Sequence, residues 1–227
     1  MENRSPQSFE CEACHDIGWM QDDGDIRRCI CRAEWDKAEL NRRLFSLCNL
    51  PAGTEHLVLG NFQFSGDPSV KEAYDAVLQL ANGANMCVTL QGDVDQGKTH
   101  LLIAAVRCYL ARGVSACYAL VPELLDQLRN AYSPTSEVNY EYQFNFFKEV
   151  GLLGLDDLGM ESPTRWAQEK LDMLIDYRYE RRLPMIVTTN LSMNELPRRI
   201  ASRLQRYLPE HRVITMRAKE YRLRAGK

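Results

Sequence analysis

The stretch Gly92-Asp93-Val94-Asp95-Gln96-Gly97-Lys98-Thr99 fits the pattern G-x-x-x-x-G-K-[ST] of a phosphate-binding loop. An apolar run over 86–90 precedes it, and an apolar helical pattern over 101–106 follows it. This order predicts a strand, the loop and a helix, which is the setting that the pattern requires. Converging backbone N–H groups and a helix N-terminus both favour a bound anion. The loop therefore predicts an α/β fold that binds a nucleoside triphosphate.

Two residues of the loop carry the expected chemistry. Lys98 would reach the β- and γ-phosphates of ATP, and Thr99 would bind Mg²⁺ through its hydroxyl. The nucleotide is expected to lie along the residues from Gly92 to Thr99 and against the next residue, His100. The alternative is an ordinary glycine-containing turn before a helix, and two further motifs disfavour it.

The second motif, Gly151-Leu152-Leu153-Gly154-Leu155-Asp156-Asp157, is a buried-strand pattern that ends in two carboxylates. In P-loop NTPases an acid at the end of such a strand holds the Mg²⁺ ion. Asp156 is therefore expected to hold the metal, directly or through water, and Asp157 to polarise the attacking water. The alternative is a solvated turn before Gly159.

The third motif is an apolar run over 184–187 that ends in Thr188, Thr189 and Asn190. Open α/β sheets bind their ligands at the carboxyl ends of the strands. Asn190 is therefore expected to contact the γ-phosphate or to orient the water. A turn or a cap is the alternative, because asparagine is common in both.

Four of the eight cysteines form the pattern Cys11-x₂-Cys14-x₁₄-Cys29-x-Cys31. Two closely spaced pairs separated by a loop are typical of a tetrahedral thiolate zinc site, although the second spacing is tighter than usual. His15 is an alternative ligand. Two disulfides are an alternative structure, but a nucleotide-binding protein without a signal peptide belongs in a reducing compartment. The remaining cysteines are expected to be small buried side chains: Cys48, Cys87, Cys108 and Cys117.

The composition is that of an ordinary globular protein, with 45% hydrophobic and 26% charged residues. We see no apolar run long enough to span a bilayer and no apolar core of a signal peptide at the start, so we expect a cytoplasmic protein and no membrane partner. The net charge of −3 does not indicate a nucleic-acid binder. From Val187 onward, however, ten basic residues face three acidic ones, which permits a basic face for phosphates or a solvated surface.

The 227 residues suffice for one full-sized domain and a small appendage. Residues 1–48 are expected to form a zinc-binding module with a linker helix over 32–47, and residues 54–227 the nucleotide-binding domain. The segment 49–53 is expected to be a hinge. Strands that alternate with helices predict a parallel, doubly wound sheet. Helices are expected over 70–82, 99–112, 122–131, 139–150, 163–181 and 193–207, and strands over 86–90, 114–121, 152–155, 185–188 and 212–216.

These motifs in this order resemble the AAA+ ATPases of the DnaC/DnaI helicase-loader group, with IstB-type transposition helper ATPases as close relatives. The resemblance runs from Phe62 to Arg222. It rests on Gly97-Lys98-Thr99-His100-Leu101, Leu155-Asp156-Asp157-Leu158-Gly159, Thr188-Thr189-Asn190-Leu191, Arg199-Ile200-Ala201-Ser202-Arg203-Leu204 and Glu220-Tyr221-Arg222.

The resemblance implies roles for individual residues. Gly97, Lys98 and Thr99 match the nucleotide loop, Asp156 and Asp157 the metal and water site, and Asn190 the sensor residue. Arg203 is similar to the arginine finger that reaches the γ-phosphate of a neighbouring subunit, a role that suits a planar guanidinium. A surface arginine is the alternative. We expect no helical lid domain after the matched region, and Arg222 would replace the lid's second sensor.

The resemblance also implies partners. The family is expected to load a hexameric replicative helicase onto single-stranded DNA, using ATP and Mg²⁺, with self-association through the ATP sites. The aromatic segment Tyr140–Phe147 matches the helical insertion that contacts DNA in this clade, with Lys148 and Arg129 as the nearest cations; core packing is the alternative. The zinc module resembles the part of DnaI-like loaders that grips the helicase.

Two residues depart from the family pattern. Asp95 stands where the loop normally has glycine, which places a negative charge near phosphate. Asp157 replaces the glutamate of many AAA+ enzymes, which fits slow hydrolysis stimulated by DNA. The alternative functions are a transposition helper that organises duplex DNA and an adaptor that does not hydrolyse ATP. A P-loop kinase is disfavoured because we find no substrate-binding segment.

Overall fold

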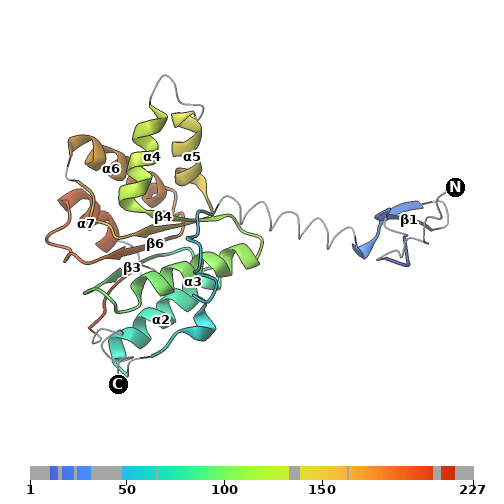
Figure 1. The fold of residues 1–227 in the computed structure, drawn as a ribbon, viewed down its shortest axis with the longest axis horizontal. Helices are drawn as coiled ribbons and strands as arrows, with labels where there is room; N and C mark the ends of the chain where they lie inside the picture. Colours follow the sequence, from blue (N-terminus) through green and yellow to red (C-terminus); the bar gives the residue numbers. More distant parts are fainter. Residues whose placement is uncertain are drawn as a thin grey trace.

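The computed structural model describes residues 11–14, 17–22, 25–31, 48–64, 66–132, 139–162, 164–206 and 211–217. Most of them form a five-stranded sheet with helices on both faces (Figure 1). The strands of this sheet are β3 (Cys87–Gln91), β4 (Ala116–Leu120), β5 (Leu152–Asp156), β6 (Met185–Thr189) and β7 (Arg212–Thr215). The main helices are α2 (Pro68–Ala81), α3 (Lys98–Ala111), α4 (Val121–Ala131), α5 (Tyr140–Glu149), α6 (Arg165–Glu180) and α7 (Arg198–Gln205), with a short 3₁₀ helix η1 (Leu59–Asn61).

The strand order is β4-β5-β6-β3-β7, and every neighbouring pair is parallel. Since the strands share one direction, their carboxyl ends lie at one edge of the sheet, as the α/β prediction requires. The loop after β3 therefore lies beside the ends of β6 and β7. The predicted fold class is confirmed.

Alternate residues of β3, β4, β5 and β6 enter two separate cores. On one face Val88 and Leu90 of β3 pack with buried residues of α2 and α3. On the other face Leu153 and Leu155 of β5 pack with α4, α5, α6 and α7. Figure 1 shows these two groups of helices on opposite sides of the sheet.

Gly154 sets how closely α3 approaches the sheet. A Cβ atom at this position would lie 2.7 Å from the side chain of Leu102 on α3. The missing side chain therefore allows α3, which follows the loop, to pack directly on β5.

The predicted boundaries of the described helices and main-sheet strands lie within two residues of those observed, except that α7 begins at Arg198 and not at residue 193. Pro197 precedes it with an extended ψ of 129°. A proline disfavours helical backbone in the residue before it, here Leu196, so residues upstream form a turn. Among the cysteines predicted to be buried, Cys48, Cys87 and Cys117 are buried, whereas Cys108 is only partly buried.

Cys48, the residue before the predicted hinge over 49–53, lies at the edge of β4. The carbonyl oxygen of Cys48 accepts a hydrogen bond from the Tyr118 N–H over 2.8 Å, and the side chains of Cys48 and Leu50 pack in the core beside α3. The outer edge of β4 is therefore partly covered. The domain boundary at this segment stays a prediction.

A second, two-stranded sheet lies near the N-terminus, where β1 (Trp19–Asp22) pairs antiparallel with β2 (Asp25–Arg28). The predicted linker helix over 32–47, His15 and Arg222 lie outside the described residues. In the part of the chain that the structure describes, no helix combines the length and the apolar character that crossing a membrane requires.

Candidate nucleotide site and cysteine cluster

The loop between β3 and α3 depends on two glycines. A Cβ atom at Gly92 would lie 2.7 Å from the Met216 carbonyl oxygen, and Gly97, with φ of 91°, lies against the ring of Phe62. Asp95 adopts φ of 61°, in the left-handed region that glycine occupies more easily. The aspartate that departs from the family pattern thus occupies a glycine-like conformation.

Lys98 folds back onto this loop. Its ammonium group donates to the carbonyl oxygens of Gly92, over 2.9 Å, and Asp93, over 2.5 Å. Burial lowers the pKa of Lys98, and the negative charges of Asp157, Asp156 and Asp93 oppose that shift. The loop therefore curls around a buried positive charge.

Asp156 is the hub of the site. The Thr99 hydroxyl, at the start of α3, donates to its Oδ1 over 3.1 Å, and Thr188 of β6 donates to the same oxygen over 2.6 Å. Tyr118 of β4 donates to Oδ2 over 2.9 Å. The two residues predicted to hold Mg²⁺, Thr99 and Asp156, are thus in direct contact. Hydroxyl and carboxylate oxygens are the ligands that Mg²⁺ prefers, so this donor set fits the ion.

Asp157 follows with a φ of 56°. Its N–H donates to the Thr188 hydroxyl over 3.0 Å, which holds the backbone in place. Burial, together with the charge of Asp156, raises the pKa of Asp157, and Lys98 opposes the shift. The residue next to Asp156 therefore combines a strained backbone with a carboxylate of raised pKa, a combination found at functional sites.

Two further residues of this site, Tyr118 and Thr188, were not predicted. Each touches Asp156 from a neighbouring strand, and both are buried. Thr188 stands within a predicted motif, but its role depends on β6 lying next to β5. Tyr118 belongs to no motif at all.

Asn190 lies at the same edge of the sheet, and His100 follows Thr99 on α3. Asn190 is partly buried just beyond the end of β6. The Nε2 of His100 donates to the Val58 carbonyl oxygen over 3.0 Å, and its ring packs edge-on against Phe62. His100 therefore attaches α3 to the segment before α2.

Arg203 pairs within its own chain. Its Nε lies 2.6 Å from Oδ1 of Asp176 on α6, and Arg199 also pairs with Asp176. The Arg203 guanidinium lies 4.5 Å from the centre of the Tyr179 ring. Although burial raises the pKa of Asp176, hydrogen bonds from both arginines outweigh it and hold that pKa below its usual range.

The aromatic residues of α5 divide between core and surface. Phe144 and Phe147 are buried, whereas Tyr142 is 74% exposed. The ring of Tyr140 stacks on that of Tyr132 at the end of α4, with centroids 4.0 Å apart.

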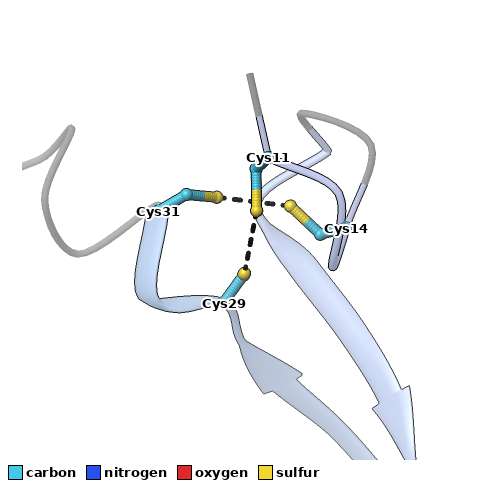
Figure 2. Close-up of side chains that lie close together, drawn as sticks. All are labelled: Cys11, Cys14, Cys29 and Cys31. Atoms are coloured by element: carbon cyan, nitrogen blue, oxygen red, sulfur yellow. Dashed lines mark hydrogen bonds between the residues drawn. The ribbon is translucent and has the colours of Figure 1, made fainter. Parts of the chain in front are cut away.

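The four N-terminal cysteines converge (Figure 2). Their sulfur atoms all lie within 4.8 Å of one another, with 3.7 Å between Cys11 and Cys29 and 3.2 Å between Cys14 and Cys31. Those distances exceed the disulfide bond of about 2.05 Å, and all four cysteines are free thiols in this structure. A tetrahedral zinc site with bonds of about 2.3 Å would separate the sulfurs by roughly 3.8 Å, which the cluster fits.

The chain matches a known protein family and resembles several known proteins. The family described as IstB-like ATP binding protein matches residues 35–225. The chain is similar to the replicative helicase loader DnaI of Bacillus subtilis, with 30% identity over 108 residues, 47% of this chain and 34% of that protein. It is also similar to the replicative helicase loader DnaC of Escherichia coli K12, with 21% identity over 83% of this chain and 77% of that protein.

The fold itself has solved neighbours. A crystal structure of DnaI matches 78% of this chain and 98% of that structure's chain, with a TM-score of 0.63 and 24% identity. Two curated Bacillus subtilis relatives are longer than the region that matches them, since the chain spans 52% of one and 34% of the other.

Proposed function

Because the chain belongs to the family of IstB-like ATP binding proteins, we propose that it is an ATP-dependent loader of a hexameric replicative helicase. One observation carries the ATPase part of the proposal. The loop lysine and threonine at the start of α3 meet two carboxylates at the end of β5, at one edge of the sheet. The similarity to two replicative helicase loaders supports the loading part.

The roles at the ATP site follow from the contacts. The backbone from Gly92 to Gly97 and the Lys98 ammonium would hold the phosphates, whose oxygens would replace the carbonyls that Lys98 now contacts. Thr99 and Asp156 would hold the Mg²⁺ ion, which neutralises phosphate charge when it is bound. Asp157 would accept a proton from the attacking water, and Asn190 would orient that water.

Arg203 is proposed to act on a neighbouring subunit. Its guanidinium would leave Asp176 and contact the γ-phosphate that the neighbour holds, so that hydrolysis depends on self-association. Arg199 would remain to pair with Asp176. Arg222 is proposed as the second sensor.

Residues 1–48 are proposed as the module that grips the helicase, and residues 54–227 as the ATPase domain. Cys11, Cys14, Cys29 and Cys31 would hold a structural Zn²⁺ ion, because thiolates at these distances suit that metal. Single-stranded DNA is the proposed nucleic-acid partner. The exposed Tyr142 and the Tyr132–Tyr140 pair offer rings for base stacking.

ATP binding is the first test. Calorimetric titration with Mg·ATP should show binding that Lys98→Ala abolishes. Lys71→Ala, a change of an exposed lysine on α2, is the matched control and should bind as the unchanged protein does. No binding by the unchanged protein would support the adaptor alternative.

Hydrolysis tests the arginine finger. Arg203→Ala should keep ATP binding and lose hydrolysis stimulated by single-stranded DNA, whereas Arg199→Ala should keep both. Normal stimulated hydrolysis by Arg203→Ala would show that the finger is assigned wrongly. A preference for duplex over single-stranded DNA would favour the transposition helper.

The partner is tested by capturing the tagged protein from host lysate with a non-hydrolysable ATP analogue. We expect the replicative helicase among the proteins identified by mass spectrometry, and we expect Cys11→Ser with Cys14→Ser to remove it. Metal analysis of the same preparations should give one zinc ion for each unchanged chain. Capture of a transposase without a helicase would overturn the loader proposal.

A further inference from the structure

Tyr118 is a buried tyrosine whose hydroxyl faces the metal-binding carboxylate. Its side chain is 7% exposed, and the hydroxyl donates to Oδ2 of Asp156 over 2.9 Å. The other oxygen, Oδ1, is already held by Thr99 and Thr188. Tyr118 is thus the group that fixes Oδ2 among the contacts found in the described residues.

The strand register explains how this contact forms. Tyr118 lies opposite Gly154, and Leu120 lies opposite Asp156, in the parallel pair of β4 and β5. The tyrosine therefore reaches along the sheet to the residue two positions beyond its partner. Because Gly154 has no side chain, nothing on β5 stands between the Tyr118 ring and the carboxylate.

The backbone of Tyr118 is hydrogen-bonded as well as its hydroxyl. Its N–H donates to the Cys48 carbonyl oxygen, so the segment before the ATPase domain lies on the outer edge of β4. A cavity of about 330 Å³ borders the same tyrosine and is lined in part by Asn49, Pro51 and Glu123. Tyr118 is thus held at its backbone by Cys48 and at its hydroxyl by Asp156.

We propose that Tyr118 is a positioning residue that fixes the Asp156 carboxylate for Mg²⁺ binding. This inference rests on the ATPase function proposed above. With Thr99 and Thr188 on Oδ1 and Tyr118 on Oδ2, rotation of the carboxyl group breaks a hydrogen bond at either oxygen. These hydrogen bonds therefore hold the carboxylate in one orientation, in which its remaining lone pairs have a fixed direction. Partners that orient a metal ligand are worth about 10- to 100-fold in metal affinity.

The hydroxyl stays protonated in this role. Burial raises the pKa of Tyr118, and the negative charge of Asp156 raises it further. The contact seen here, in which the hydroxyl donates to Asp156 Oδ2, is therefore the one expected at neutral pH.

The test measures metal binding directly. Mn²⁺ binding to the full chain with a non-hydrolysable ATP analogue is followed by electron paramagnetic resonance, and nucleotide binding without metal is measured in parallel. Tyr118→Phe should weaken Mn²⁺ binding about tenfold or more and leave metal-free nucleotide binding unchanged. Tyr109→Phe removes the hydroxyl of another buried tyrosine, on α3, and should change neither.

The outcomes separate the two proposals. If the unchanged protein binds no Mn²⁺–nucleotide complex, the ATPase proposal fails and this inference with it. If the unchanged protein binds and Tyr118→Phe binds equally well, only the positioning role is wrong. An equal loss of Mn²⁺ binding in Tyr109→Phe would also overturn the positioning role, because removing any buried tyrosine hydroxyl would then have the same effect. Tyr118→Met is a second hydroxyl-free variant if the phenylalanine variant does not fold.

Discussion

The hydroxyl of Thr188 joins both carboxylate residues of the site, because it donates to Oδ1 of Asp156 over 2.6 Å and accepts the N–H of Asp157 over 3.0 Å. A single side chain on β6 thereby sets the rotamer of one aspartate and the backbone of the next. The strained φ of Asp157 is held from a neighbouring strand.

Thr188→Val keeps the shape of the side chain and removes this hydroxyl. We expect the free energy of unfolding to fall by about 1–3 kcal/mol, because a buried carboxylate oxygen loses a donor and a buried N–H loses its acceptor. Urea unfolding measures the change. Thr188→Ser retains the hydroxyl and should recover most of the loss; an equal loss in both variants would contradict the hydrogen-bond explanation.

Asp95→Gly should tighten ATP binding. Glycine adopts the positive φ of this position freely, and the change removes a negative charge near the phosphates. One partly exposed like charge is worth about 0.5–1 kcal/mol, or roughly two- to fivefold in Kd. Asp95→Asn removes the charge and also tolerates the left-handed backbone, so titration calorimetry should give the same gain. A gain in the glycine variant alone would assign the effect to the backbone.

His211 predicts a pH dependence of stability. Its Nδ1 accepts the N–H of Cys87, and burial lowers its pKa to about 4. The unfolded chain binds a proton near pH 6.5, before the folded chain does. The free energy of unfolding should therefore fall as the pH drops from about 6.5 to about 4. His211→Asn offers a similar acceptor that does not titrate, and chemical unfolding at several pH values should show a smaller slope.

Arg178 should be among the residues on which stability depends most. It is fully buried, and its guanidinium donates to the carbonyl oxygens of Lys148 and Val150 at the end of α5 and of Pro184 before β6. Burial lowers its pKa to about 10, so it stays charged at neutral pH.

Arg178→Met should lower the free energy of unfolding by about 3–5 kcal/mol, since several buried carbonyl groups would lose their donor. Arg181→Met changes an exposed arginine that lies over the Tyr177 ring and should cost about 1 kcal/mol or less. Thermal unfolding of the two variants compares them. Similar losses of unfolding free energy in the two variants would contradict the importance assigned to the buried hydrogen bonds of Arg178.

The local motifs were predictable from the sequence because the residues that each motif requires lie close together in the chain. The loop needs glycine, lysine and threonine at fixed spacing, and the acidic strand needs apolar residues followed by carboxylates. Lys98, Thr99 and Asp156 accordingly meet where the sequence predicts that they meet. The cysteine pairs are a second example, since their spacing already predicts a shared site.

Contacts that depend on strand order were not predictable in the same way. Tyr118 reaches Asp156 only because β4 pairs with β5 in one particular register. Arg178 looks like a surface residue of a charged helix, yet its position facing the end of α5 buries it. Arg203 has a recognisable motif, but its pairing with Asp176 depends on how α7 packs on α6. In each of these cases tertiary packing brings the partner near, and neighbouring residues in the sequence do not indicate such a contact.

The sheet order has a consequence for how the protein is made. The central strand β3 pairs with β6 and β7, and both of these come much later in the chain. During synthesis the phosphate loop leaves the ribosome with its flanking positions in the sheet still empty, and non-local pairing of this kind is slow to form. The apolar strand β3 therefore lacks both of its partners in the sheet until β6 emerges, and lacks one of them until residues near 215 emerge. The proposed ATP site is incomplete during that early stage of folding, because Gly92 of the loop packs against the Met216 carbonyl oxygen.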